Sequence, residues 1–411
     1  MKHCTIIGGG IIGLCSAYYL LKENYEVTVI DKSDIVSGAS FVNAGYITPS
    51  HIIPLAAPGM ITKGMKYMFN SSSPFFVKPR LDKDFLKWTW LFKKACTKKN
   101  VEKSTQTILD INLLSQQLFK EIYESGDVDF HIEHKGLLMA FQKEASKKHE
   151  QEVVDRASAM GLQIAYVDKT SLAKLEPNLI AEGAFHYYSD SHTTPQLFMA
   201  SMKQFLQKKG VAFKTNEEVL SIDPVQERIE VKTVKNTYQT DEVVVATGAW
   251  SEKIAKQFGV YIPVQAGKGY SINTEASTKI THPTVLMEAN VAVTPMRGFT
   301  RFAGTMELAG LSENIRKERV EAIANAASKF YKNVSLSEEE KENAAYGFRP
   351  VSPDGLPFIG KLGTHKNITI ATGHAMMGWS LGPGTGKLVA QLIANKKTAM
   401  AIERFLPERF S

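Results

Sequence analysis

Thr5-Ile6-Ile7-Gly8-Gly9-Gly10-Ile11-Ile12-Gly13 is the stretch that decides the fold of this chain. Its apolar, β-branched start predicts a short buried strand, and residues 14–21 have the length and composition of a helix. Residues 26–30 predict a second strand, and Asp31 stands at its end. A strand, a glycine turn, a helix, a strand and an acid in this order are typical of the βαβ unit that binds a dinucleotide.

The glycines of this turn have distinct tasks in such a unit. Gly8 permits the tight turn, Gly10 leaves room for a pyrophosphate, and Gly13 lets the helix pack closely on the strand. The helix N-terminus offers unpaired N–H groups to the phosphates, and Asp31 accepts hydrogen bonds from a ribose. An ordinary glycine turn would not require an acid at this place. We therefore expect the unit to hold its cofactor through Gly8, Gly10, Ile11, Ile12, Gly13, Asp31 and Lys32.

The length, composition and net charge are those of an ordinary globular protein that is long enough for two domains. The 411 residues are 44% hydrophobic and 22% charged, and the net charge of +7 is modest for this length. We expect no nucleic-acid partner, although this charge is compatible with weak attraction to anionic substrates or lipid. No apolar run approaches the roughly 20 residues of a membrane span. The N-terminus enters a strand directly, so we expect no signal peptide and a cytoplasmic location.

The cysteines are few, and no metal site is expected. Cys4, Cys15 and Cys96 are read as free thiols, consistent with a reducing compartment. No CxxC pair or histidine cluster has the spacing of metal ligands.

The rest of the chain alternates between predicted helices and strands. A stretch of small residues, 37–45, would let the backbone approach a ligand or form a solvent loop. Residues 50–80 predict an irregular connection with a short helix around 60–69. Helices are predicted at 105–124, 147–160, 195–209 and 312–330, and strands at 136–141, 183–188, 243–246 and 368–371, with an antiparallel ribbon around 229–240.

Residues 83–99 alternate lysines with large aromatic residues. Such a helix could lie on an anionic membrane surface. It could equally pack its aromatic residues on the body of the protein, with the lysines reaching into solvent. We favour the packed helix.

Five further motifs, together with the opening stretch, resemble the D-amino-acid oxidase family of flavoproteins, over nearly the whole chain. They follow the opening GGGIIG and Asp31 along the sequence: Ser40 with Asn43-Ala44-Gly45, VVVATGAW at 243–250, KGYS at 268–271, FRPVSPDGLPFIG at 348–360 and GHAMMGWSLGPGTGK at 373–387. The runs LEPNL at 175–179, RFAGTMEL at 301–308 and RPVSPDG at 349–355 look most like the bacterial D-amino-acid dehydrogenase branch. Glycine, sarcosine and hydroxyproline-type oxidases or dehydrogenases are close relatives of that branch.

The resemblance implies an α/β fold, in which a discontinuous Rossmann-like FAD-binding domain joins an α+β substrate domain with a mostly antiparallel sheet. We assign residues 1–82, 193–263 and 345–411 to the FAD-binding domain, and residues 83–192 and 264–344 to the substrate domain. Further cofactor contacts are expected at Ser40, Asn43, Ala44, Gly45, Val219, Ala246, Thr247, Gly248, Trp250, Gly373, Met377, Gly378, Gly382 and Thr385.

The implied reaction is oxidative deamination of a small amino acid, in first place a D-amino acid. A hydride passes from Cα to flavin N5, and the imino acid hydrolyses to a 2-oxo acid and ammonia. We expect a quinone-type acceptor, with oxygen as the alternative. A glycine, sarcosine or D-hydroxyproline-type enzyme is the alternative within the family. A nicotinamide-dependent dehydrogenase, which ATGAW and the C-terminal glycine-rich helix argue against, and a non-catalytic flavin-binding subunit are the alternatives outside it.

Arg349 is assigned the substrate carboxylate, because its planar fork of donors fits that group, with a structural ion pair as the alternative. Arg301 is a weaker candidate with a structural role. His51 and Tyr270 are candidates for the cavity wall or for structural polar residues, and Met376 for an apolar pocket wall. His374 is expected to position the flavin-side loop.

We expect FAD to be bound without a covalent bond. The sarcosine-oxidase branch attaches FAD through a cysteine shortly before its Pro-Asp pair, where this chain has Gly347. No cysteine follows Cys96. Gly382–Gly386 opens the last helix, whose N-terminus would stabilise negative charge on the reduced flavin; close packing is the alternative role of these glycines.

Overall fold

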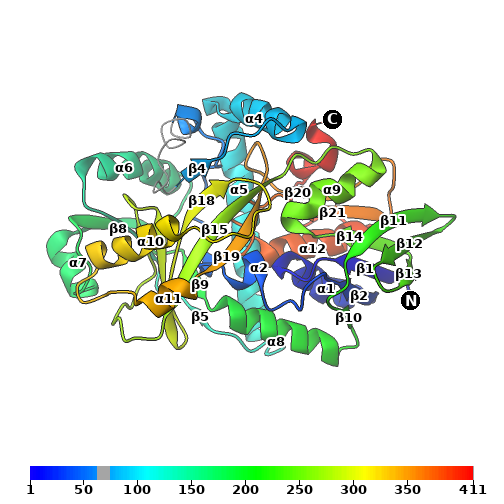
Figure 1. Cartoon of the computed structure of the whole chain (residues 1–411), viewed down its shortest axis with the longest axis horizontal. Coiled ribbons are helices and arrows are strands. Elements are labelled where there is room, and N and C mark those ends of the chain that lie inside the picture. The colour runs from blue at the N-terminus through cyan, green and yellow to red at the C-terminus, as the bar shows by residue number, and fades with distance from the viewer. Residues whose placement is uncertain (63–74, 411) are drawn as a thin grey trace.

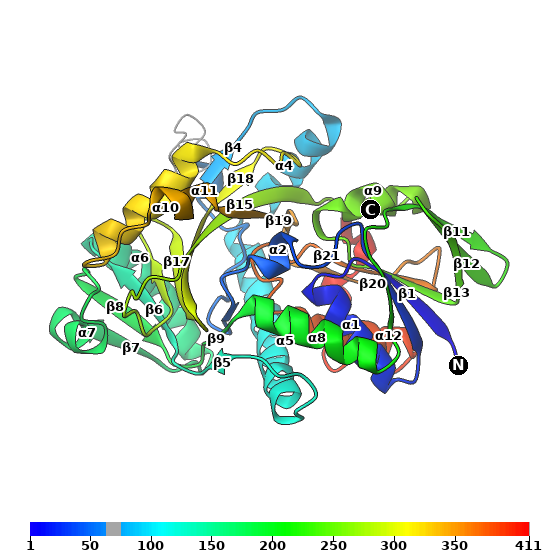
Figure 2. The same cartoon turned by 60° about the horizontal axis from the view of Figure 1, so that its bottom comes forward.

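The computed structural model describes residues 1–62 and 75–410, and the short helix expected around residues 60–69 falls mostly outside them. A parallel sheet with its helices forms one side of the molecule, and a larger antiparallel sheet forms the other (Figure 1). The long helix α5 (Lys98–Glu124) lies between the two in both views (Figure 2).

The first sheet has six strands in the order β10-β2-β1-β14-β21-β20. All neighbours are parallel except β20 and β21. Its strands are rich in valine and isoleucine because helices cover both faces, as Val243, Val244 and Val245 show by their complete burial. The strands are β1 (His3–Ile7), β2 (Glu26–Ile30), β10 (Ala212–Lys214), β14 (Glu242–Val245), β20 (Phe358–Lys361) and β21 (Ile368–Thr372).

Helix α12 (Gly382–Ile393) packs closely on α1 (Ile11–Lys22) and α5 through its glycines. A Cβ on Gly382 would lie 2.6 Å from the Ile11 side chain, and one on Gly386 would lie 2.5 Å from the backbone of Cys15. Gly384 meets Ser115 of α5 in the same way. These glycines therefore serve close packing, the alternative considered for them, and the stabilisation of a reduced flavin by the N-terminus of α12 stays a prediction. Helix α8 (Pro195–Lys208) lies alongside α1 (Figure 2).

The second sheet has nine strands, eight of them in the order β19-β15-β18-β17-β16-β6-β8-β7. Strand β4 (Phe75–Val77) pairs with the end of β18. All pairs are antiparallel except β16–β6 and β18–β4. The strands are β6 (Leu137–Phe141), β7 (Ile164–Asp168), β8 (Gly183–Tyr187), β15 (Gln265–Thr274), β16 (Thr284–Leu286), β17 (Val291–Met296), β18 (Phe299–Leu308) and β19 (Ala345–Val351). The expected α/β fold with a mostly antiparallel second sheet is confirmed.

Shorter elements complete the two sides. Helices α6 (Glu144–Ala159), α7 (Lys169–Leu175), α10 (Lys317–Phe330) and α11 (Glu338–Glu342) surround the second sheet (Figure 1). The expected ribbon is confirmed and has three strands, β11 (Val219–Val225), β12 (Arg228–Thr233) and β13 (Thr237–Thr240). Another small sheet joins β3 (Tyr46–Ile47), β9 (Ser191–Thr193) and β5 (Ile132–Glu133). The remaining helices are α2 (Gly38–Phe41), α9 (Ser251–Ala255), η1 (Gly248–Trp250), η2 (Lys256–Phe258), η3 (Glu403–Phe405) and η4 (Pro407–Phe410).

Two strands cross the boundaries expected between the domains. β4 lies within residues 1–82 and β19 within residues 345–411, yet both hydrogen-bond into the antiparallel sheet. Edge pairing joins them to β18 and β15, so at these two places sheet membership differs from the expected assignment. The division into two discontinuous domains otherwise stays a proposal.

Helix α4 (Lys83–Ala95) packs on the body, as favoured from the sequence. Asp82 caps its N-terminus by accepting a hydrogen bond from the Phe85 backbone N–H at 2.7 Å. Phe85, Trp88 and Phe92 are buried on one face, while Trp90 is half-exposed on the other. Across residues 1–62 and 75–410, every helix is too short or too polar to span a bilayer.

Candidate active site

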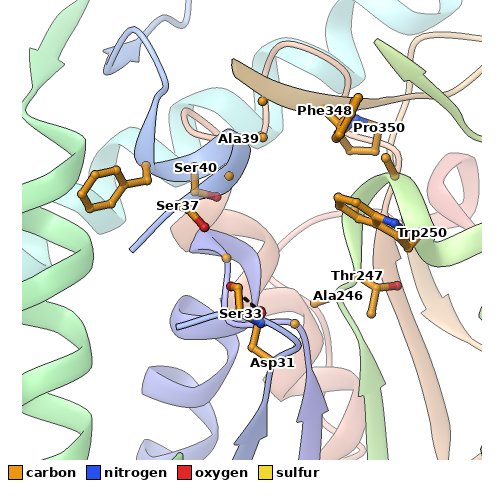
Figure 3. Close-up of a pocket in the computed structure, with 18 of the residues that line it drawn as sticks. Asp31, Ser33, Ser37, Ala39, Ser40, Ala246, Thr247, Trp250, Phe348 and Pro350 are labelled. Carbon is orange, nitrogen blue, oxygen red and sulfur yellow. Dashed lines mark hydrogen bonds between the residues drawn. The ribbon is translucent and has the colours of Figure 1, made fainter. Parts of the chain in front are cut away.

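A cavity of about 710 Å³ opens where the strands of the parallel sheet end. Ile7, Ile30, Ala246 and Thr372 come from the carboxyl ends of β1, β2, β14 and β21, the edge at which such sheets bind ligands. Strand β19, the edge strand of the antiparallel sheet, forms the opposite wall with Tyr346–Pro350. Figure 3 shows the two walls facing each other, with Asp31 and Ser33 on one side and Phe348 and Pro350 on the other.

The glycine turn has the geometry of a cofactor cradle. Gly8 has φ +105°, and a Cβ there would lie 2.4 Å from the Ala246 carbonyl oxygen. A Cβ on Gly13 would lie 1.9 Å from the carbonyl oxygen of Gly8, so this residue packs the helix on the turn and does not reach the cavity wall. Gly10 lines the cavity, and a Cβ there would contact only Ser40 Oγ, at 3.2 Å. Protein atoms therefore crowd the turn at Gly8 and Gly13, whereas the turn is open toward the cavity at Gly10.

The N-terminus of α1 can hold an anion. Ile11 N donates to Ser40 Oγ at 3.0 Å, and Gly9 N donates to Asp31 Oδ2 at 2.6 Å. The N–H groups of Gly10 and Ile12 donate to no acceptor in residues 1–62 and 75–410, although both residues line the cavity. Free N–H groups at a helix N-terminus are the donors that a pyrophosphate requires.

Asp31 fixes the turn and keeps acceptor capacity. Its Oδ1 accepts from both the backbone N–H and the hydroxyl of Ser33 at 2.7 Å. Its Oδ2 accepts only from Gly9 N within the described chain, so lone pairs are left for a hydroxyl in the cavity.

Aromatic side chains close the cavity near the glycine turn. The rings of Trp250 and Phe348 meet edge to face with centroids 5.7 Å apart. Lys32 Nζ lies 3.6 Å from the centroid of the Trp250 ring. Figure 3 shows Trp250 below Phe348, both turned toward the cavity.

Arg349 presents an uncompensated charge at the cavity. Its Nη1 donates to the carbonyl oxygen of Thr305 at 2.7 Å, and no carboxylate of the described residues lies within 4.0 Å of its guanidinium. Burial lowers the pKa of Arg349 to about 10, which leaves it charged at neutral pH. The described residues thus offer Arg349 no structural ion pair, the alternative considered for it, and an anionic ligand would supply the missing partner.

The comparisons with known proteins agree with this geometry. The model of the DAO family, described as FAD dependent oxidoreductase, matches residues 3–392. The chain belongs to this family of FAD-dependent oxidoreductases. A D-amino acid dehydrogenase of Vibrio vulnificus (strain YJ016) is 30% identical to the oxidoreductase over 404 residues, covering 96% of both chains. A D-amino acid dehydrogenase of Neisseria gonorrhoeae (strain ATCC 700825 / FA 1090) is 29% identical, with the same coverage.

Solved structures share the fold of the oxidoreductase. A glycine oxidase from Geobacillus kaustophilus aligns with TM-score 0.78 at 20% identity, covering 100% of this chain and 99% of its own. An L-proline dehydrogenase from P. horikoshii aligns with TM-score 0.74 at 21% identity, covering 100% and 97%. At these identities the likeness shows the fold alone.

The oxidoreductase uses FAD, and the cavity fits it. The free N–H groups of Gly10 and Ile12 suit a pyrophosphate, and Asp31 suits a ribose hydroxyl. Most of the expected cofactor residues lie on the wall: Gly8, Gly10, Ile11, Ile12, Asp31, Lys32, Ser40, Asn43, Val219, Ala246, Thr247, Gly248, Trp250 and Gly378. No three metal-ligating side chains of residues 1–62 and 75–410 gather as a metal site.

Seven other expected cofactor residues lie behind the wall: Gly13, Ala44, Gly45, Gly373, Met377, Gly382 and Thr385. Gly45 packs on the Thr193 carbonyl, and Thr385 Oγ1 bonds His374 Nε2 at 3.0 Å. The first N–H groups of α12 are also used inside the protein, because Gly382 N donates to Trp379 O and Gly384 N to Ser115 Oγ. These two N–H groups are therefore already paired within the protein.

Arg301 ties the two sides of the oxidoreductase together. This buried side chain donates from Nη1 to the carbonyl oxygens of Phe41 at 3.1 Å and Asn43 at 2.7 Å. Its Nε donates to Asn273 Oδ1 at 2.9 Å. The guanidinium thus anchors the small-residue stretch 37–45 to the antiparallel sheet, in keeping with the structural role expected for it.

Tyr270, Met376 and His51 do not line the cavity. Tyr270 is buried and donates to Glu307 Oε2 at 3.0 Å, because strand alternation turns it away from the face of Gly269. Met376 is 49% exposed, because Ala375 takes φ +48° and turns the chain outward. His51 Nδ1 lies 3.3 Å from Ser50 Oγ, and burial lowers the pKa of His51 to about 4.

Sequence reasoning missed several cavity residues: Ser33, Ser37, Ala39, Phe41, Gln196, Glu217, Lys253, Gln257, Glu313, Tyr346, Phe348 and Ala375. The small residues of 37–45 carried a signal, since that stretch was expected to approach a ligand. Tyr346 and Phe348 flank Gly347 on the strand that carries Arg349, so alternation along that strand could have found them.

Asp190 beside His51 predicts a pH-dependent stability. Its carboxylate accepts from Ser50 Oγ at 2.5 Å and Ser50 N at 3.2 Å, and burial raises the pKa of Asp190 to about 7. The unfolded chain releases this proton near pH 4 and the folded chain near pH 7, so this group lowers stability progressively between those values. Asp190→Asn should remove that slope and stabilise the protein at pH 8 by a few kcal/mol, at about 1.4 kcal/mol per tenfold change in proton affinity.

Urea unfolding at pH 4.5 and pH 8 measures this difference, with Asp110→Asn on the exposed face of α5 as the matched control. An Asp190→Asn variant that is equally destabilised at both pH values would show that the hydrogen bonds to Ser50 outweigh the buried charge.

Proposed function

We propose that this oxidoreductase deaminates a small amino acid oxidatively, in first place a D-amino acid. The observation that carries the proposal is the charged Arg349 guanidinium, which faces the cavity and has no carboxylate partner in residues 1–62 and 75–410. The names of the relatives, D-amino acid dehydrogenase in Vibrio vulnificus and Neisseria gonorrhoeae, support the same substrate class.

The chain's own residues would bind and orient the substrate. Arg349 pairs with the carboxylate and thereby fixes the direction of Cα–H within the cavity. Bound FAD supplies a two-electron acceptor for the hydride. The Cα–H bond breaks with its electron pair and the amine loses a proton, so an imino acid forms, which water hydrolyses to a 2-oxo acid and ammonia. His374 is buried, and burial lowers its pKa to about 3, so it stays neutral and positions Thr385.

An anaerobic substrate screen tests this function. Purified yellow protein is mixed with D-alanine, L-alanine, glycine, sarcosine and D-hydroxyproline, and the flavin absorbance is followed. We expect bleaching to be fastest with the D-amino acid. Fastest bleaching with glycine or sarcosine would assign the alternative within the family, and no bleaching with any amine would assign a non-catalytic subunit.

The proposed electron acceptor is a quinone. With substrate present, reduction of a soluble quinone analogue should be at least tenfold faster than peroxide formation in air. Peroxide formation as fast as quinone reduction would make the protein an oxidase.

We further propose that α4 contacts the inner face of the cytoplasmic membrane. Leu81, just before α4, is 95% exposed, and Leu86 and Trp90 on the helix are 51% and 53% exposed. The same helix carries the exposed lysines Lys83, Lys87, Lys93 and Lys94. Lys94 Nζ lies 3.7 Å from the Trp90 ring, which keeps a cation beside the apolar tip. Apolar tips among lysines suit an anionic lipid surface.

Sedimentation with liposomes measures this contact. The protein should pellet with vesicles containing anionic lipid and stay in solution with neutral vesicles, and Leu86→Ser/Trp90→Ser should weaken pelleting several-fold. The matched control is Leu220→Ser, an exposed leucine on the β11 ribbon. Equal pelleting of all variants, or none by the unaltered protein, contradicts the contact.

FAD should be released intact by acid. Gly347 stands where the resemblance to the sarcosine-oxidase branch would imply the attachment cysteine. A Cβ there would lie 2.6 Å from Ala39 Cα, so no side chain fits there. Cys4 and Cys15 are buried in the βαβ unit. After acid precipitation the supernatant should contain all of the flavin, and a yellow pellet would show a covalent bond.

A further inference from the structure

The pairing of β15 with β18 is interrupted beneath Arg349. Lys268 pairs with Glu307 and Tyr270 with Gly304, so the single residue Gly269 faces both Thr305 and Met306. One residue opposite two is a β-bulge, a device that redirects backbone groups beside functional sites. Here the redirected group is the Thr305 carbonyl, which accepts the hydrogen bond from Arg349 Nη1 at 2.7 Å.

Thr305 adopts a costly conformation at this bulge. Its φ is +64°, in the left-handed region that β-branched residues rarely adopt. Its Oγ1 is also buried without a hydrogen-bond partner among the described residues. The hydroxyl therefore gives this backbone no support, whereas the carbonyl of the same residue accepts the hydrogen bond from Arg349.

Gly269 is needed for space and not for backbone freedom. Its φ lies outside the left-handed region, so any residue could adopt its conformation. A Cβ there would lie 2.1 Å from Nη1, 2.3 Å from Cζ and 2.3 Å from Nη2 of Arg349. These three guanidinium atoms are its nearest neighbours, so Gly269 forms the floor on which the guanidinium lies.

We propose that Gly269 and Thr305 are positioning residues that hold Arg349 for the substrate carboxylate. Gly269 sets how closely the guanidinium approaches β15, and the Thr305 carbonyl accepts the hydrogen bond from Nη1. Nε and Nη2 donate to no acceptor among residues 1–62 and 75–410 and are left for the ligand. This inference rests on the function proposed for Arg349.

The test measures whether a methyl group at 269 acts through Arg349. FAD-loaded Gly269→Ala should bind propanoate, a carboxylate without an amine, at least tenfold more weakly by calorimetry. Its KM for a D-amino acid should rise by a similar factor, while its melting temperature changes little. In the Arg349→Ala background, adding Gly269→Ala should change neither propanoate binding nor melting temperature, because the clashing group is gone.

Gly267→Ala, on the same strand as Gly269, is the matched control, since its methyl group would meet Met306 Sδ at 2.3 Å and would approach only the backbone oxygen of Arg349, at 3.6 Å, and not its guanidinium. Adding Arg349→Ala should not reverse the effects of Gly267→Ala, because the two side chains do not clash. If Gly269→Ala binds propanoate as the unaltered protein does while Arg349→Ala does not, the positioning role is wrong. If Gly269→Ala lowers the melting temperature equally in both backgrounds, the glycine is structural only. If Arg349→Ala itself leaves propanoate binding unchanged, the proposed function fails instead.

Discussion

Gly10→Val should yield a folded but colourless protein. Gly10 has ordinary backbone angles, φ −67° and ψ 179°, and a side chain there would meet only Ser40 Oγ within the protein. The valine would instead fill the space above the free N–H groups of Gly10 and Ile12, where the pyrophosphate is expected. The apoprotein also loses the stabilisation that a bound ligand provides, about 2.7–4 kcal/mol at 100–1,000 times its Kd.

Far-UV circular dichroism and the flavin absorbance measured on the same sample separate folding from cofactor binding. Gly363→Val, at an exposed glycine whose Cβ would meet only Glu408 Oε1 at 3.5 Å, should stay yellow. Gly13→Ala should fail to fold, because its methyl group would lie 1.9 Å from a backbone oxygen. Full flavin occupancy in Gly10→Val would remove the N-terminus of α1 as the pyrophosphate site.

Arg349→Ala should lower kcat/KM for a D-amino acid by roughly 10- to 100-fold. A charge-assisted hydrogen bond contributes about 1.5–3 kcal/mol, and each 1.4 kcal/mol corresponds to about a factor of ten. KM should rise and flavin reduction should slow together, because the same fork binds the carboxylate and aligns Cα–H. Arg349→Lys should recover only part of the loss, since an ammonium has no planar fork and leaves space above Gly269.

Stopped-flow flavin reduction over a range of substrate concentrations gives both quantities. Arg297→Ala, an exposed arginine in the turn between β17 and β18, is the control and should leave both unchanged. Amines without a carboxylate should react equally slowly with Arg349→Ala and the unaltered protein. Unchanged reduction of Arg349→Ala by the D-amino acid would refute the assignment.

The parts of the fold that follow from local spacing could be predicted. Strand, glycine turn and helix are set by neighbours in the sequence, so Gly8, Gly10 and Asp31 lie where the βαβ pattern placed them. The antiparallel second sheet followed from the family resemblance. Arg349 also reaches the cavity, since an arginine on an edge strand has a route to the ligand.

The residues whose places could not be predicted from the sequence depend on contacts between distant segments. The glycines of α12 could serve a cofactor or a neighbouring helix, and only the approach of α1, more than 350 residues away, decides between them. Tyr270 adjoins Gly269, but alternation along β15 places the two on opposite faces. The bulge at Thr305 has no signal in composition, because threonine is an ordinary strand residue and its positive φ occurs where the pairing of two distant strands, β15 and β18, is interrupted.

The packing of α12 against α1 has a consequence for synthesis on the ribosome. The glycine turn, residues 8–13, is made first. Strand β21 completes its sheet and α12 covers its helix, but both emerge about 360 residues later. At roughly 5–20 residues per second, the turn waits about 20–70 s for them. We therefore expect FAD to load only after β21 and α12 have been made. Nascent chains or truncated products that end before β21 should then pass through the cell as flavin-free clients of chaperones and proteases.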